Sequence, residues 1–211
     1  VSAALDTMAY EDIYVSEKID GTWSALKSLG TTVNTSEIET SPFITADKKT
    51  LYFSVGGHPA FNCPLYNDET YTDYNLEFEK PETSQSYLLN MTSGLVTDQK
   101  VSVFTEGHKI PLHKNLFNND ALIFKDLKSR KVTLKHKNKG TVLSVVFKEF
   151  PFLGIWAKPN APYVCIEPWI GIADSETTNQ QIEAKEDYNF IYDFFMEHIN
   201  GYTISLFRDK T

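Results

Sequence analysis

The sequence predicts an all-β protein that forms a large antiparallel β-sandwich. Aromatic residues make up 13% of the chain, with 14 Phe and 11 Tyr, and they accompany many Thr, Val and Ile. Aromatic and β-branched side chains favour strands over helices. Short strand-like runs also recur along most of the chain, separated by turn signals, which is typical of a sandwich rather than of alternating strands and helices. A length of 211 residues allows one large domain or two small ones.

The expected strands follow one another in chain order. The first, Asp12–Glu17, precedes Asp20-Gly21, a hairpin-type turn. The later expected strands are Pro42–Thr45, Thr50–Val55, Asn75–Phe78, Ser86–Leu89, Val101–Phe104, Ala121–Phe124, Lys131–Lys135, Val142–Phe147, Tyr163–Ile166 and Tyr202–Phe207. Tyr188–Ile199 alone also allows a helix, because its apolar residues recur at helical spacing, although its many aromatics suit a strand equally.

Composition argues against several classes of partner. The net charge is −8 and the only two arginines are Arg130 and Arg208, so we expect no nucleic acid and no anionic membrane as partner. The chain has neither an apolar run of about 18 residues nor a charged-then-apolar leader, and we expect a cytoplasmic protein. Cys63 and Cys165 have no metal-type spacing and fit two buried free thiols.

One block of chemically distinctive residues follows the expected strand Thr50–Val55. It reads Gly56-Gly57-His58-Pro59-Ala60-Phe61-Asn62-Cys63-Pro64. Glycines permit close backbone approach and prolines fix the backbone, so His58 would be held on a rigid turn at the end of a strand. A histidine satisfied by local hydrogen bonds is the alternative. Imidazole suits proton transfer because its ordinary pKa lies near neutrality.

A second block places a carboxylate at the end of an apolar strand. Val164-Cys165-Ile166-Glu167-Pro168-Trp169 alternates so that Cys165 and Glu167 share one face. Burial beside apolar groups would raise the pKa of Glu167 unless a partner compensates, which suits a base that works near neutral pH. A solvent-facing edge glutamate is the alternative. The tryptophans could offer flat faces to sugar C–H groups or belong to the core.

Several blocks together resemble the aldose 1-epimerases (galactose mutarotase-like), LacX-like branch. They are GGHPAFNCP, YTDYNLEFEK, NDALIFKDLKS and WAKPNAPYVCIEPWIGIADSE, collinear over about residues 52–182. The resemblance implies that family's large β-sandwich and an isomerase of carbohydrate metabolism that interconverts the anomers of an aldohexose. His58 would be the general acid on the ring oxygen, and Glu167 the general base on the anomeric hydroxyl, the two flanking one hexose.

The same resemblance implies the remaining site residues. Asp120 matches a region from which the family binds a sugar hydroxyl, although a turn aspartate is an equal alternative. Phe61, Asn62 and Trp169 are expected to contact substrate. No metal and no organic cofactor is expected. Oligomeric state is left open.

The first part of the chain has a different character. Residues 11–54 resemble a single TolB/PD40-type β-propeller repeat, which predicts a segment 1–54 packed on a sandwich of residues 55–211. One repeat cannot form a propeller alone. It suggests the periplasm as the alternative compartment. No Arg or His precedes His58, whereas the family binds sugar with both from its N-terminal portion, so the sandwich would be N-terminally incomplete.

Three functional hypotheses follow from this sequence. The chain is an aldose 1-epimerase, a non-catalytic carbohydrate-binding module, or a fused or truncated chain without intact activity. The first is favoured because both chemical blocks are present.

Overall fold

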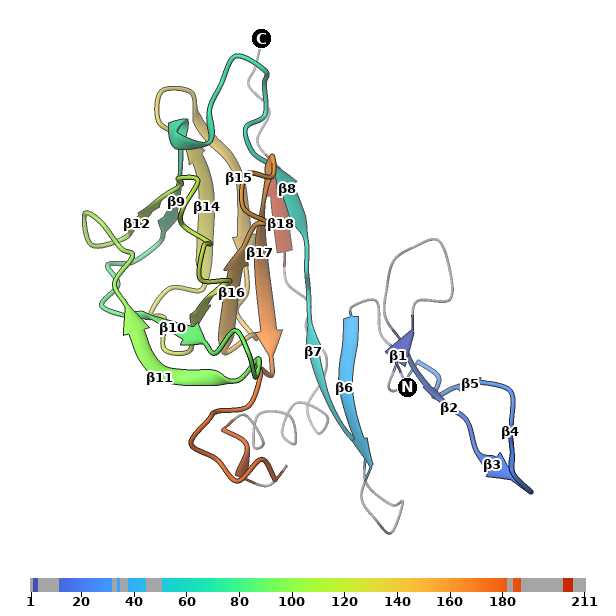
Figure 1. Cartoon of the computed structure of the whole chain (residues 1–211). Helices are drawn as coiled ribbons and strands as arrows, with labels where there is room; N and C mark the ends of the chain where they lie inside the picture. The colour runs from blue at the N-terminus through green and yellow to red at the C-terminus, as the bar shows by residue number, and fades with distance from the viewer. Residues whose placement is uncertain are drawn as a thin grey trace.

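Two antiparallel sheets pack face to face in the central part of the molecule (Figure 1). The computed structural model describes residues 2–3, 12–31, 34, 38–44, 51–181, 184–186 and 203–206. Within these residues the larger sheet has eight strands in the order β11-β10-β13-β16-β17-β7-β6, with β8 also paired to β17. The smaller sheet has five strands in the order β12-β9-β14-β15-β18. The predicted all-β sandwich is therefore confirmed, and the galactose mutarotase-like expectation for its fold is met by the comparisons below.

The strands are mostly short, as the spacing of turn signals predicts. Those of the larger sheet are β6 (Ile38–Ile44), β7 (Leu51–Gly56), β8 (Ala60–Asn62), β10 (Ser86–Leu89), β11 (Val96–Val101), β13 (Leu122–Phe124), β16 (Phe152–Trp156) and β17 (Tyr163–Ile170). Those of the smaller sheet are β9 (Tyr74–Phe78), β12 (Lys109–Pro111), β14 (Lys131–His136), β15 (Gly140–Val146) and β18 (Thr203–Leu206). A single turn of 3-10 helix, η1 (Tyr71–Asp73), leads into β9.

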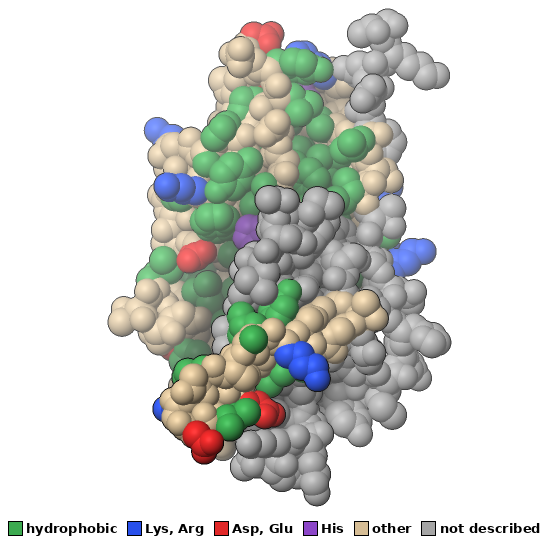
Figure 2. Space-filling model, turned by 90° about the vertical axis from the view of Figure 1, so that its right-hand side faces the viewer, with side chains coloured by type: hydrophobic (Ala, Val, Ile, Leu, Met, Phe, Trp, Pro, Cys, Tyr) green, Lys and Arg blue, Asp and Glu red, His purple; other side chains and the backbone are tan. Residues whose placement is uncertain are grey.

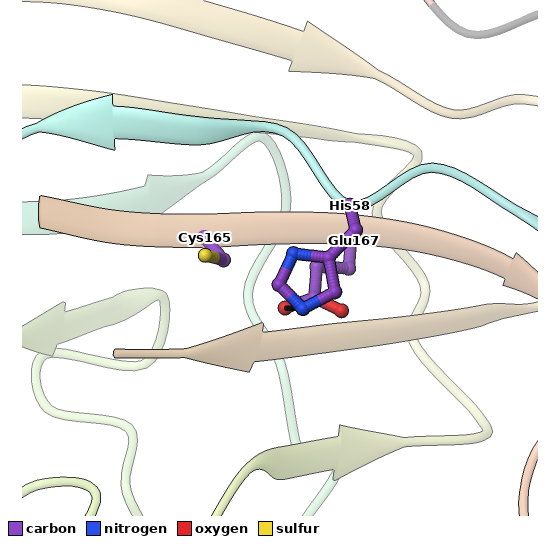
Figure 3. Close-up of side chains that lie close together, drawn as sticks. All are labelled: His58, Cys165 and Glu167. Atoms are coloured by element: carbon purple, nitrogen blue, oxygen red, sulfur yellow. Dashed lines mark ion pairs between the residues drawn. The ribbon is translucent and has the colours of Figure 1, made fainter. Parts of the chain in front are cut away.

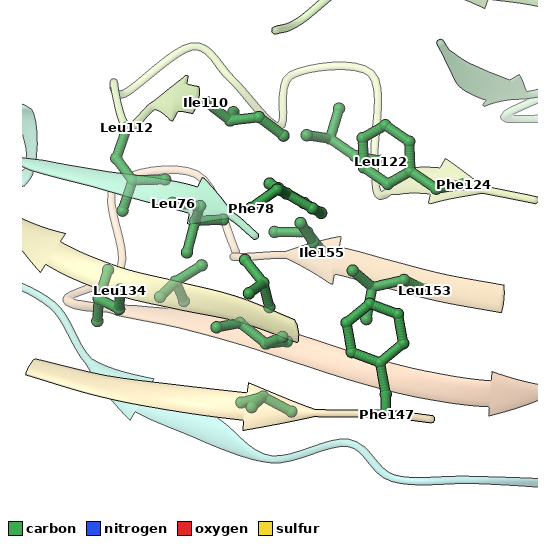
Figure 4. Packing of buried hydrophobic residues seen from close by; sticks show 14 of the residues in the cluster. Leu76, Phe78, Ile110, Leu112, Leu122, Phe124, Leu134, Phe147, Leu153 and Ile155 are labelled. Atoms are coloured by element: carbon green, nitrogen blue, oxygen red, sulfur yellow. The ribbon is translucent and has the colours of Figure 1, made fainter. Parts of the chain in front are cut away.

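The hydrophobic core fills the space between the two sheets (Figure 4). From the smaller sheet it takes Leu76, Phe78, Ile110, Val132, Leu134, Leu143 and Val145, and from the larger sheet Leu122, Phe124, Leu153, Ile155, Val164, Ile166 and Ile170. Val164 and Ile166 in β17 point into this core. Because side chains alternate along a strand, Cys165 and Glu167 in β17 must point to the other face of the larger sheet. That outer face carries the candidate site.

Some expected strand positions were wrong. β11 ends at Val101, where the sequence predicts a strand to begin. The cause is a tight turn in which Gly94 N–H donates to the carbonyl of Asn90 over 2.8 Å, which returns the chain so that pairing starts at Val96. Strands β8, β12 and β16 were not expected. Residues 188–199, open to a helical reading, lie outside the described residues.

The described strands of residues 1–54 do not share one sheet. β1 (Ser2–Ala3), β2 (Asp12–Val15) and β5 (Lys27–Ser28) make one small sheet, and β3 (Lys18–Ile19) and β4 (Thr22–Trp23) make a separate hairpin. β6 instead pairs with β7 in the larger sheet. The resemblance to a PD40-type repeat therefore finds no support, because a blade requires these strands to share one sheet.

Local turn chemistry in this segment is nevertheless as the sequence predicts. Asp20 and Gly21 both have positive φ, 49° and 84°, which is the conformation of a two-residue hairpin turn between β3 and β4. Asn34 links two distant parts of this segment by hydrogen bonds. Its side-chain oxygen accepts from the Ile13 N–H, and its side-chain nitrogen donates to the Ile13 carbonyl.

The visible surface carries scattered charge. On the side shown in Figure 2, Lys and Arg side chains lie singly, and hydrophobic side chains gather over the upper half. Among the described residues, no helical segment has the length and apolar character that a bilayer crossing needs.

Candidate active site

His58 lies on a turn that is fixed to β17 at both ends. β7 ends at Gly56, and β8 begins at Ala60. Gly57 N–H donates to the carbonyl of Pro168 over 3.0 Å, and Ile166 N–H donates to the carbonyl of Pro59 over 3.3 Å. These two hydrogen bonds span the turn, so they hold His58 over the part of β17 that contains residue 167.

Glu167 is a buried carboxylate on the outer face of the larger sheet. It lies within β17, opposite Gly154 in β16. Its neighbours Ile166 and Val164 belong to the core, as the alternation predicts. The glycine opposite it has no side chain, and the indole ring of Trp169 occupies the space that a side chain would take there.

The imidazole and the carboxylate are in contact (Figure 3). His58 Nε2 lies 3.3 Å from Glu167 Oε1, with the histidine side chain 49% exposed and the glutamate side chain 3% exposed. The distance qualifies as an ion pair when His58 is protonated. The contact between the two groups is not a hydrogen bond. Oε1 of Glu167 accepts no hydrogen bond from any described residue. The sequence predicts that the two groups flank one hexose, and in the structure they lie in direct contact with each other.

Burial raises the pKa of Glu167 to about 8. Loss of hydration is the main cause, and the negative charge of Asp120 adds to it, while a hydrogen bond from the Trp169 side chain opposes it. The rise that the sequence predicts for a carboxylate in this setting is therefore present. A carboxyl group with such a pKa can accept or donate a proton near neutral pH.

Cys165 and Trp156 complete the surroundings of the pair. Cys165 Sγ lies within 4.8 Å of ligand atoms of both His58 and Glu167, and the three side chains lie together beside β17 (Figure 3). Burial, with the nearby charge of Glu167, raises the pKa of the Cys165 thiol to about 12, so the thiol is neutral. The Trp156 ring stands edge-on to the His58 ring with centroids 6.2 Å apart.

Of the other expected site residues, some lie close to the pair and some do not. Asp120 is half-buried and near enough to affect the pKa of Glu167. Its φ of 72° and a 2.7 Å hydrogen bond from Ala121 N–H to its own Oδ1 define the turn before β13. Phe61 instead packs against the main core, opposite Val164, while Asn62 is exposed opposite Tyr163.

Sequence reasoning treated Cys165 as a buried free thiol and did not place it beside the pair. It left open whether the tryptophans contact sugar or belong to the core, and Trp156 does both pack against the core and lie beside His58. The signal for both was available, because Cys165 shares the alternation of Glu167, and Trp156 pairs with Cys165 across β16 and β17.

Two surface hollows lie on the sandwich. One, of about 370 Å³, is lined by residues that include Asp120, Asn115 and His113. The other, of about 230 Å³, lies between Tyr71 and the loop 157–162. Neither is lined by His58 or Glu167.

Comparisons with known proteins show what the chain as a whole is similar to. No protein-family model matches the chain. Over 161 residues it is 37% identical to the LacX proteins of Lactococcus lactis subsp. lactis, plasmid and chromosomal, which covers 75% of this chain and 52% of each relative. The chain therefore spans about half the length of the curated relatives it matches.

Solved structures show the same likeness. A galactose mutarotase related enzyme from Lactobacillus acidophilus matches with a TM-score of 0.55 and 33% identity, over 65% of this chain and 46% of that one. A galactose mutarotase-like protein from Lactobacillus casei ATCC 334 matches with a TM-score of 0.55 over 89% of this chain and 62% of that one, and its 20% identity indicates fold alone. The chain is thus similar to LacX and to a galactose mutarotase related enzyme, and its fold is a galactose mutarotase-like β-sandwich.

Proposed function

We propose that the chain carries an aldose 1-epimerase site, in which His58 and Glu167 interconvert the α and β anomers of an aldohexose. The observation that supports this most is the 3.3 Å contact between an accessible imidazole and a buried carboxylate. Proton donor and proton acceptor thus meet at one point on the outer face of the sheet.

The proposed reaction conserves protons. Protonated His58 donates to the ring oxygen O5 while ionised Glu167 takes the proton from the anomeric hydroxyl O1. The C1–O5 bond breaks and the C1–O1 bond becomes a carbonyl. Rotation about C1–C2 then presents the other face of the carbonyl, and ring closure returns both protons with the roles reversed. Each correctly placed group contributes about 10²–10⁴ in rate.

The close contact of the two groups fits this chemistry. O5 and O1 are bonded to the same carbon, so an acid and a base that act on both must converge on one edge of the sugar. The sugar would then lie across the pair with its hemiacetal edge toward both side chains, and not between them. The exposed half of His58 leaves that approach open.

Neighbouring side chains have supporting roles in this proposal. Trp169 hydrogen-bonds to the Glu167 carboxylate, which fixes its orientation and offsets part of the rise in its pKa. Trp156, edge-on to His58, offers an apolar surface beside the pair. Asp120 and exposed Asn62 are the polar groups that could bind sugar hydroxyls. Acid–base chemistry of this kind requires no cofactor.

Polarimetry tests the proposal. Freshly dissolved α-glucose or α-galactose should relax to equilibrium faster with the protein than in buffer. His58→Asn and Glu167→Gln should each remove most of the enhancement. His108→Asn, at a partly exposed position, and Glu149→Gln, at an exposed one, change the same residue types elsewhere and should keep it. Relaxation at the buffer rate with the unmodified protein would refute the assignment.

A non-catalytic carbohydrate-binding module is the second candidate. One observation favours it: burial raises the pKa of Glu167 to about 8, so near neutral pH most of the proposed base is protonated and cannot accept a proton. Saturable binding of galactose or glucose by calorimetry without rate enhancement would establish this alternative.

A further inference from the structure

We propose that His58, Cys165 and Glu167 form a three-ligand site for a divalent transition-metal ion, Zn²⁺ in particular. The three side chains supply one nitrogen, one sulfur and one oxygen, all within 4.8 Å of one another. Imidazole, thiolate and carboxylate are the ligands that zinc sites in proteins use. Sites with three protein ligands keep the fourth position open for water or substrate.

The distances suit a tetrahedral ion. Zinc bonds to nitrogen and oxygen of about 2.0–2.2 Å place two such ligands about 3.3 Å apart at the corners of a tetrahedron. His58 Nε2 and Glu167 Oε1 are 3.3 Å apart. Cys165 Sγ, within 4.8 Å of both, needs an approach of about 1 Å to reach bonding distance. The half-exposed His58 side chain, on its turn between β7 and β8, can supply that movement.

A separate observation points to a ligand at this place. Glu167 Oε1 is buried and accepts no hydrogen bond from any described residue, although it faces the other two groups. A buried polar atom without a partner costs free energy, which a metal bond would recover. One dication, one thiolate and one carboxylate also sum to zero charge, which suits a buried location.

One of the three proposed ligands is held in place by a neighbouring side chain. The Trp169 side chain hydrogen-bonds to the Glu167 carboxylate and so holds its orientation. Hydrogen bonds of this sort to a ligand fix its geometry around a metal. Cys165 would enter as the thiolate, and its proton would leave to solvent as the metal–sulfur bond forms.

Metal binding and sugar epimerisation would compete. The ion would use the His58 and Glu167 lone pairs that the proposed epimerase needs for proton transfer. Zinc should therefore inhibit any epimerase activity reversibly. Metal binding itself does not depend on the proposed function, and it is measured without sugar.

The test uses the chelator-treated protein and titrates Zn²⁺ by calorimetry and Co²⁺ by absorption. We expect one equivalent to bind, with a near-ultraviolet thiolate-to-cobalt band as the signature of Cys165. Cys165→Ser should remove that band. His58→Asn, on an exposed turn away from the core, and Glu167→Gln should each weaken binding about tenfold or more.

Matched controls separate this site from other thiols and imidazoles. Cys63→Ser changes the other buried cysteine, which belongs to the core between the sheets, and it should leave stoichiometry and band unchanged. His108→Asn changes a partly exposed imidazole elsewhere on the molecule and should do the same. The proposal is overturned if no saturable binding occurs, if Cys165→Ser or His58→Asn binds as tightly as the unmodified protein, or if Cys63→Ser alone abolishes the band.

Discussion

The indole ring of Trp169 lies over Gly154, so closely that a methyl group at Gly154 would come within 2.2 Å of the ring. Gly154 is the residue that pairs with Glu167 across β16 and β17. The same indole passes Gly56 at the end of β7, where a methyl group would meet it at 2.6 Å. The two strands on either side of β17 therefore each carry a glycine that leaves room for the indole ring of Trp169. Trp169 in turn hydrogen-bonds to Glu167.

Gly154→Ala should therefore displace the indole and destabilise the protein. Overpacking of this kind costs about 1–3 kcal/mol in the free energy of unfolding. Urea denaturation measures it. In a Trp169→Leu background the same change should cost much less, because the obstructing ring has gone. An equal penalty in both backgrounds would show that the glycine is required for another reason.

The rate of epimerisation should depend on pH through Glu167. The proposed base must be ionised and the proposed acid protonated, so kcat/KM should follow a bell-shaped dependence on pH, with one limb set by the pKa of Glu167 at about 8. Polarimetry between pH 5 and 9.5, with the buffer rate subtracted, measures this. A rate with no inflection near pH 8 would exclude Glu167 as the base.

The causes of the shifted pKa can be separated by two substitutions. Asp120→Asn removes a negative charge that raises the pKa of Glu167, so the limb set by Glu167 should move to lower pH. Trp169→Phe removes a hydrogen bond that lowers it, so the limb should move to higher pH. Shifts in the same direction for both variants would contradict the electrostatic explanation.

Glu167 should also make the protein less stable at alkaline pH. Its pKa is about 8 when folded against an ordinary value of 4.5. Between these values the folded chain binds a proton that the unfolded chain has released, so the free energy of unfolding falls as pH rises through this window and is lowest above about pH 8. Below pH 4.5 both states are protonated and the effect vanishes.

Glu167→Gln should accordingly raise Tm at pH 9 and change it little at pH 4.5. The gain at pH 9 is on the order of a few kcal/mol, the size of the burial penalty that the pKa shift reports. Thermal melts at the two pH values measure it, with exposed Glu149→Gln as the control for loss of one charge. A variant that is less stable than the parent at pH 9 would refute the destabilising role of the carboxylate.

Part of this site could be foreseen in the sequence, and part could not. Alternation along Val164–Glu167 placed Cys165 and Glu167 on one face, because strand geometry is local. The contact of His58 with Glu167 depends on hydrogen bonds between segments more than a hundred residues apart, which no local pattern encodes. Phe61 was misplaced for the same reason: its side depends on the register of β8 against β17.

The fold shows the same division between local and long-range information. Asp20-Gly21 forms its turn as predicted, since the two residue types favour that backbone. β16 was not foreseen, because its five residues are mostly buried and apolar and lack the alternation of a half-exposed strand. The resemblance of residues 11–54 to a propeller repeat found no support. Strand pairing, not strand composition, decides which sheet a strand joins, and β6 pairs with β7 in the larger sheet.

A last prediction concerns a buried polar cluster beside the smaller sheet, formed by residues that follow the block Gly56–Pro64 in the chain. Tyr74, in β9, is fully buried, and its hydroxyl donates to Glu69 while it accepts from Leu65 N–H over 3.1 Å. Lys139 Nζ contacts the other oxygen of Glu69 at 2.5 Å. Tyr74→Phe removes the donor to Glu69 and the acceptor for Leu65 together.

Tyr74→Phe should lower the free energy of unfolding by about 1–3 kcal/mol, the cost of buried polar groups left without partners. Tyr66→Phe is the matched control, since Tyr66 is 55% exposed and its change should cost almost nothing. Urea denaturation measures both variants. Because neither tyrosine contacts the His58–Glu167 pair in the described structure, polarimetry at a temperature where both remain folded should give the parent rate. A loss of activity in folded Tyr74→Phe protein would mean that the loop held by Glu69 takes part in sugar binding.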